Sequence, residues 1–151
     1  MLKRVWNWAK EVDGKDLKPI VDLITKDYKS QIRKGNDGSG KRMPLVKMST
    51  MKMPVRFGDT NSPIREDVNN SVKPLVATGK TVNSIRYVKK GDGYEIGASD
   101  EKSDMILAVN SKTRRTRNNT VQPARDALIV SDRQFDIIEK ELIKSLVKAL
   151  K

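Results

Sequence analysis

The sequence contains no cysteine and no histidine among its 151 residues. The first absence excludes disulfides and thiol nucleophiles, and the second excludes imidazole general bases. Together they remove the usual ligands of a structural zinc site. The 19 acidic residues are scattered rather than paired. We therefore expect no cofactor, no metal and no enzymatic activity, because no constellation of catalytic groups is visible.

Aromatic residues and long apolar runs are also scarce. Aromatic side chains make up 5% of the chain and apolar side chains 36%, so we expect a modest core and spare surface for burial against partners. No apolar run is long enough for a signal peptide or a membrane span. We therefore predict one domain over residues 1–151, with no membrane partner.

Positive charge is in clear excess, with 31 basic residues and a formal net charge of +12. Residues 39–56 carry five basic and no acidic side chains, and residues 111–125 do the same. Such segments could contact neighbouring proteins, contact DNA backbones, or simply be solvated. They contain no interleaved aromatic residues, which argues against a stacking platform for single strands. No recognition motif for a sequence-specific regulator is present.

The order of helical and strand patterns predicts an α+β fold. We expect a small antiparallel sheet flanked by a long N-terminal helix and a C-terminal amphipathic helix, with extended loops. The long helix begins near Asp16 and ends near Gly35. Alternation at 84–88 and 94–96, joined by a turn at 89–93, predicts a β-hairpin.

Shorter helices are expected as well, over residues 2–12, 80–83 and 103–109. Ser131 or Asp132 caps the last helix, which carries acidic residues early and lysines late, as the helix dipole favours. Its predicted apolar stripe consists of Phe135, Ile138, Leu142, Leu146 and Ala149, widened by Ile137, Ile143 and Val147.

Two segments show neither helical nor strand periodicity. Residues 35–73 form a predicted long irregular loop, in which glycines, prolines and methionines alternate with cations. We interpret it as a docking arm, with a flexible insertion as the alternative. Residues 111–122 form a predicted basic arm, in which 116–121 could turn back as a β-arm at Asn118-Asn119.

These patterns lead to three groups of candidate site residues. Partner or subunit contacts are assigned to Trp6, Trp8, Met43, Met48, Met51, Met53 and Arg125. Contacts with DNA or an acidic partner are assigned to Lys112, Arg114, Arg115 and Arg117. The third group is a structural turn, in which Thr78 can cap a helix and Gly79 permits its tight entry.

Three ordered segments resemble a known family. The segments are Pro74–Ile85 with its Thr78-Gly79 and Ser84-Ile85, Tyr94–Gly97 with its Ile-Gly ending, and Pro123-Ala124-Arg125. In this order and spacing they resemble the virion morphogenesis family of tailed phages, the Mu-like neck and tail completion proteins. Met43-Pro44-Leu45 with Thr50 is similar to a further element of that family.

The resemblance implies a structural protein of the virion head–tail junction, made in the host cytoplasm during assembly. It implies a ring, a hexamer or dodecamer, that joins the portal or connector to tail terminator or tail tube proteins and lets double-stranded DNA pass. No small-molecule substrate is implied. The alternative from the charge pattern is a small, non-specific DNA-binding protein.

Overall fold

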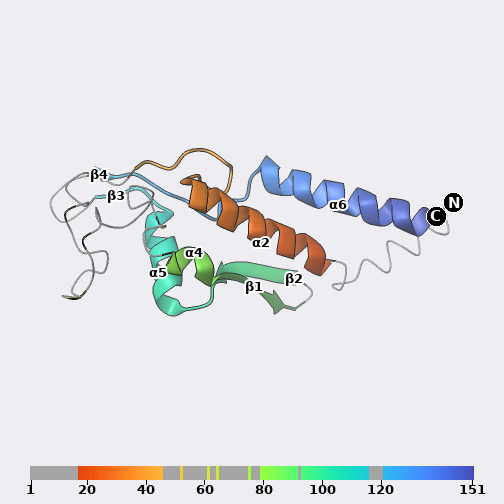
Figure 1. The fold of residues 1–151 in the computed structure, drawn as a ribbon, viewed down its shortest axis with the longest axis horizontal. Coiled ribbons are helices and arrows are strands. Elements are labelled where there is room, and N and C mark those ends of the chain that lie inside the picture. The colour runs from red at the N-terminus through yellow and green to blue at the C-terminus, as the bar shows by residue number, and fades with distance from the viewer. Residues whose placement is uncertain are drawn as a thin grey trace.

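The computed structural model describes residues 17–45, 52, 61, 64, 75, 79–91, 93–115 and 121–151, with backbone alone at 114 and 122. Within these residues the chain is α+β, as predicted. The elements shown in Figure 1 are α2 (Leu17–Lys34), α4 (Lys80–Ser84), β1 (Ile85–Lys90), β2 (Gly93–Ala98), α5 (Glu101–Asn110), β3 (Arg114–Arg115), β4 (Val121–Gln122) and α6 (Asp132–Leu150).

Helix α2 confirms the predicted long N-terminal helix. Its end is a Schellman motif, in which the N–H of Gly35 donates to the carbonyl of Ile32 and the N–H of Asn36 donates to that of Gln31. Gly35 has a φ of 85°, a left-handed conformation that glycine adopts without steric cost. The sequence therefore ends the helix where the pattern predicted.

Strands β1 and β2 form the predicted antiparallel hairpin, in a register that runs from Ile85 opposite Ala98 to Lys90 opposite Gly93. Both strands are longer than predicted, and the expected five-residue connection shortens to residues 91 and 92. Gly91 has a φ of 60°, and positive φ favours such two-residue hairpin loops. The second sheet pairs β3 with β4, so the paired residues flank most of the predicted β-arm, whose residues 116–120 lie outside the described part.

Helix α2 lies between the hairpin and α6 (Figure 1). Its C-terminal end joins one buried cluster, whose members are Ile32, Met43, Val82, Ile85, Leu107 and Ala127. Nearer its N-terminus, Ile20, Ile24 and Tyr28 form a second cluster, against which Ile137, Ile138 and Leu142 of α6 pack. Ile96 and Leu128 pack against both clusters, so the two are continuous.

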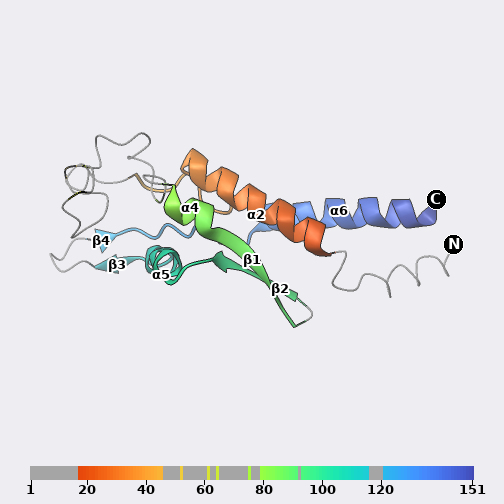
Figure 2. The same cartoon turned by 60° about the horizontal axis from the view of Figure 1, so that its bottom comes forward.

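The register of α6 differs from the predicted stripe. Phe135 is 59% exposed, whereas the neighbouring Gln134 is 2% exposed. Gln134 stays buried because both its amide nitrogen and its amide oxygen have hydrogen-bond partners, described below. A buried amide that is fully hydrogen-bonded is tolerated. Ile143 and Val147 are also about half exposed. In both views, the C-terminal part of α6 extends past the start of α2 (Figure 2).

The turn before α4 contains the predicted glycine. Gly79 has a φ of 69° and is itself the N-cap residue, without a side-chain cap. Thr78, to which the sequence assigned the cap, lies outside the described residues. The carbonyl of Gly79 accepts a hydrogen bond of 2.9 Å from the N–H of Asn83, which closes the single turn of α4.

We predict that Gly79→Val lowers the free energy of unfolding by about 1–3 kcal/mol, because a β-branched side chain strains a left-handed backbone. Gly79→Asn should cost less, since asparagine tolerates this conformation. Gly93→Val is the matched control, because an added Cβ there meets no atom closer than 3.9 Å and φ is not positive. Urea unfolding measures all three, and equal midpoints for the two Gly79 variants would contradict this account.

Candidate assembly interface

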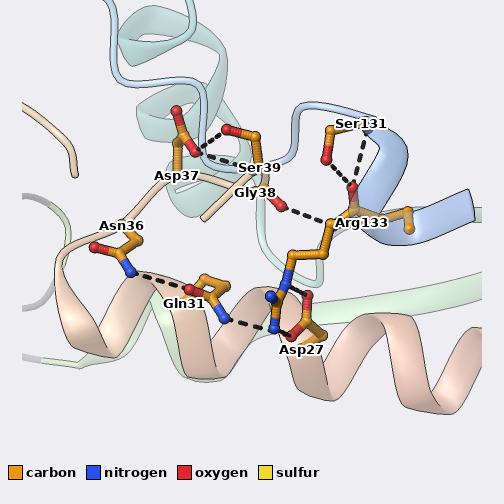
Figure 3. A network of polar contacts seen from close by, with 9 residues as sticks. Asp27, Gln31, Asn36, Asp37, Gly38, Ser39, Ser131 and Arg133 are labelled. Atoms are coloured by element: carbon orange, nitrogen blue, oxygen red, sulfur yellow. Dashed lines mark hydrogen bonds and ion pairs between the residues drawn. The ribbon is translucent and has the colours of Figure 1, made fainter. Parts of the chain in front are cut away.

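A polar network ties three parts of the chain together where α2, the loop after it and the start of α6 meet (Figure 3). The loop is built around Asp37. Its Oδ1 accepts hydrogen bonds from the N–H and hydroxyl of Ser39 and from the N–H of Lys41, at 2.7–3.0 Å. Such side-chain to backbone bonds stabilise a tight turn. The predicted irregular loop therefore begins with an ordered segment over residues 36–42.

Gly38 packs tightly against α2 and the segment before α6. A Cβ added to Gly38 would lie 2.6 Å from the ring of Tyr28 and 2.7 Å from the carbonyl of Ile129. The Tyr28 hydroxyl donates to that same carbonyl at 3.2 Å, and burial raises the pKa of Tyr28 to about 12. Only glycine lets the loop pack this closely.

Gln134 connects the loop to the N-terminus of α6. Its amide nitrogen donates to the carbonyl of Gly38 at 2.7 Å, and its amide oxygen accepts from the backbone N–H and hydroxyl of Ser131. Ser131 is the N-cap and Gln134 is the third helical residue, which is the spacing of a capping box. Sequence reasoning missed Gln134, although Ser-x-x-Gln was the signal that could have found it.

Asp27 and Arg133 form the ion pair between α2 and α6. The guanidinium of Arg133 donates to both carboxylate oxygens of Asp27, at 2.8 and 2.6 Å. This hydrogen bonding holds the pKa of Asp27 below its ordinary value, although partial burial opposes the shift. The pair fixes how the two antiparallel helices are aligned, since a bidentate contact is geometrically specific.

Arg125, which the sequence assigned to a partner, makes contacts within its own chain. Its side chain is 8% exposed, and its guanidinium donates to the carbonyls of Pro44 and Leu45 at 2.9 and 3.2 Å. Its backbone N–H donates to the carbonyl of Asn110. Arg125 therefore holds the end of the ordered loop against the C-terminal end of α5, because its guanidinium donates to the carbonyls of Pro44 and Leu45 while its backbone N–H donates to Asn110.

Met43 also differs from its expected role as a partner contact. It is 2% exposed and belongs to the buried cluster with Ile32 and Ile85. Its N–H donates to the carbonyl of Gly35 at 2.9 Å, which draws the loop back over the end of α2. Met43 therefore fills the protein's own core, as flexible methionine side chains often do.

The remaining predicted site residues are only partly described. Lys112 and Arg115 are exposed, and Arg114 lies in β3 beside Arg115. The structure does not bring Arg125 to the surface with them. Outside the described residues lie Trp6, Trp8, Met48, Met51, Met53 and Arg117.

An apolar surface remains on α6 away from α2. Ile143 and Val147 are 52% and 48% exposed, whereas Ile138 and Leu142 on the other side pack against α2. Phe135, which is 59% exposed, lies at the start of the helix. Residues 143 and 147 are one helical turn apart and therefore neighbours on the surface. A helix with apolar residues on two sides can pack one side in its own core and leave the other available to another molecule.

Comparison with known proteins finds no matching family model, no matching curated protein and no matching solved structure. Over the described ranges, no group of three or more acidic side chains is placed to hold a metal ion. No helix in that same part of the chain is long and apolar enough to cross a membrane.

We predict that Asp27→Asn lowers the free energy of unfolding at pH 7 by about 1 kcal/mol, because Arg133 is partly exposed and solvent screens the pair. The pKa of Asp27 is lowered from 3.8, so its contribution is present above that value. It is lost as pH falls through the lowered pKa. The difference between wild type and variant should therefore shrink in acid, as measured by urea unfolding at a series of pH values.

Glu95→Gln is the control for this prediction, since both members of the Lys90–Glu95 pair are more than 60% exposed. Its unfolding midpoint should stay close to that of wild type, because solvent screens an exposed pair. A cost of Asp27→Asn that stayed constant well below pH 3.8 would contradict the assigned pKa shift.

We predict that Arg125→Met lowers the free energy of unfolding by about 1.5–3 kcal/mol, because the carbonyls of Pro44 and Leu45 lose a charged donor. Arg125→Lys should have an intermediate effect, since one ammonium cannot reproduce the planar fork. Lys112→Met, at an exposed position, should stay within about 0.5 kcal/mol of wild type. Chemical denaturation measures the series, and an Arg125→Met midpoint equal to that of Lys112→Met would refute the role of Arg125.

Proposed function

We propose that this chain is a structural virion protein of the phage head–tail junction, of the neck or tail completion type. In this proposal identical subunits form a ring that joins the head connector to the tail and lets DNA pass. The chain has no enzymatic role and needs no cofactor. Its partners are other copies of itself, the portal or connector, and tail terminator or tail tube proteins.

The observation that supports the proposal most is where the three family-like segments lie. Val82 and Ile85 of the first segment are buried in one cluster, and Ile96 of the second packs against it. Arg125 of the third is buried beside that cluster's Met43, through its bonds to the next two residues. The described residues of the three segments thus belong to one connected structural unit, as a shared fold would require.

The surface is consistent with assembly. The described core is small, and large apolar side chains remain exposed on several elements, including Met105 of α5 and Val88 of β1. Phe135, Ile143 and Val147 add to this apolar surface on α6. Subunits that assemble bury such side chains against neighbours.

The test is immunogold electron microscopy of tailed particles from cells that encode the chain, with mass spectrometry of the purified particles. We expect label at the head–tail junction. Label elsewhere on the tail would overturn the assigned position, and particles that lack the chain by both methods would overturn the structural role.

The net charge of +12 supports one alternative, a small non-specific DNA-binding protein. Under that alternative, neutralising Arg114, Arg115 and Arg117 together should abolish DNA binding and flatten its salt dependence. A neck protein should instead keep its ring or connector contacts and bind DNA only weakly.

A further inference from the structure

The last turns of α6 extend beyond the helix on which α6 packs. Leu142 of α6 and Leu17, the first residue of α2, both pack against the buried cluster around Ile24. Beyond Leu142, α6 continues to Leu150, which is about 12 Å of helix. In both views this part extends past the start of α2 (Figure 2), which therefore cannot cover it. We call residues 143–150 the distal part of α6.

Two large apolar side chains lie on the distal part of α6. Ile143 and Val147 are about half exposed, and neither belongs to a buried cluster of the described residues. They are one helical turn apart and therefore adjacent on the surface. Because burying a large aliphatic side chain is favourable, a segment within reach of this pair gains free energy by covering it.

The chain itself supplies an apolar segment just before Leu17. Residues 1–16 lie outside the described residues, and the sequence predicts a helix within them, over residues 2–12. Helical spacing places on one face Leu2, Val5, Trp6, Ala9 and Val12. A helix of this length is about 16 Å long, which is enough to span the distal part of α6.

The connection between the predicted helix and α2 is short. Residues 13–16 span at most about 14 Å when extended, whereas packed helices lie about 8–10 Å apart. The predicted helix therefore reaches α6 near the start of α2, and Gly14 allows the chain to turn there. A segment tethered this closely has an effective concentration in the millimolar range, well above that of a second copy of the chain in dilute solution.

We propose that residues 2–12 pack as a helix against the distal part of α6, and that the indole of Trp6 covers Ile143 and Val147. A tryptophan side chain buries about 150–250 Å², which is enough to cover both. Trp8 is two residues further on and faces a different side of the same helix, so it stays in solvent. Trp6, assigned from the sequence to a partner contact, then belongs to the chain's own fold. The inference does not depend on the proposed function.

The β-hairpin is a less suitable surface for this segment. Val88 of β1 is 67% exposed, but Arg86 and Lys90 on the same face of the strand are exposed as well. A single apolar side chain between two cations gives less apolar area to bury than the adjacent Ile143 and Val147.

Covering the distal part of α6 changes which surface is left for a neighbouring subunit. Phe135 at the start of α6, Val88 of β1 and Met105 of α5 stay exposed. Contacts between subunits are therefore expected at these residues rather than at Ile143 and Val147, because apolar side chains that stay in water are the ones a neighbour can still bury.

The experiment uses Trp6 and Trp8, the two tryptophans of the sequence, as separate probes in the full-length chain. Trp8→Phe leaves Trp6 as the single indole, and Trp6→Phe leaves Trp8. The Trp6 probe should emit at a shorter wavelength than the Trp8 probe. Its acrylamide quenching constant should be less than about half that of the Trp8 probe, because a ring packed against a helix is reached from one side only.

Substitutions on α6 test the contact itself. In the Trp8→Phe background, Ile143→Ser with Val147→Ser should shift the Trp6 emission to the wavelength of the Trp8 probe. The matched control is Val88→Ser with Met105→Ser, which removes two apolar side chains that are at least as exposed and should leave the Trp6 emission unchanged. Circular dichroism checks that both variants stay folded, and the comparison of the two probes stands without them.

Three results would overturn the proposal. One is a Trp6 probe that is as exposed as the Trp8 probe. Another is shielding of Trp6 that survives the substitutions on α6, which would place the segment elsewhere on the fold. The third is shielding that fades on dilution together with the sedimentation coefficient, which would identify a second copy of the chain as the occupant. Particle labelling tests the neck role separately.

Discussion

Helix α2 has to be buried on two sides, and the arrangement of the other described elements follows from that constraint. Its C-terminal end needs Val82 and Ile85 from the α4–β1 corner, and its N-terminal half needs Ile138 and Leu142 from α6. Burying a large aliphatic side chain contributes about 1.5–3 kcal/mol. A chain with so few apolar residues cannot leave either side of this helix uncovered, so the hairpin and α6 must occupy opposite positions around it.

Apolar contacts alone would not fix how these layers are aligned, because aliphatic side chains can slide and repack at small cost. The polar contacts supply the alignment. Arg133 reaches Asp27 with two bonds, Gln134 spans the loop and the cap of α6, and Arg125 holds the carbonyls after Met43. Each of these groups loses its partner if the layers shift, and a buried polar group without a partner is costly.

The sequence predicted those features that depend on neighbours along the chain. The end of α2 at Gly35, the hairpin, and the left-handed Gly79 all follow from local steric and periodic rules. Features that depend on distant partners could not be predicted in this way. Helical periodicity predicts that Phe135 is buried, but Gln134 is buried instead because it bonds to the distant Gly38. Met43 stands in a loop segment of the sequence, and the loop is held in place by bonds from the distant Arg125 to the two residues after Met43. Lys29 and Arg33 of α2 bond to Asn83 of α4, fifty or more positions away, and no pattern in the sequence connects them.

The two sides of α2 leave different surfaces exposed. On one side, α6 leaves Ile143 and Val147 about half exposed, and its C-terminal part extends past the start of α2 (Figure 2). Exposed apolar side chains of this kind can be buried against another protein, where water is excluded. On the other side, α2 packs against the corner of α4 and β1. Because α2 contacts both, it holds the apolar surface of α6 at a fixed position relative to that corner.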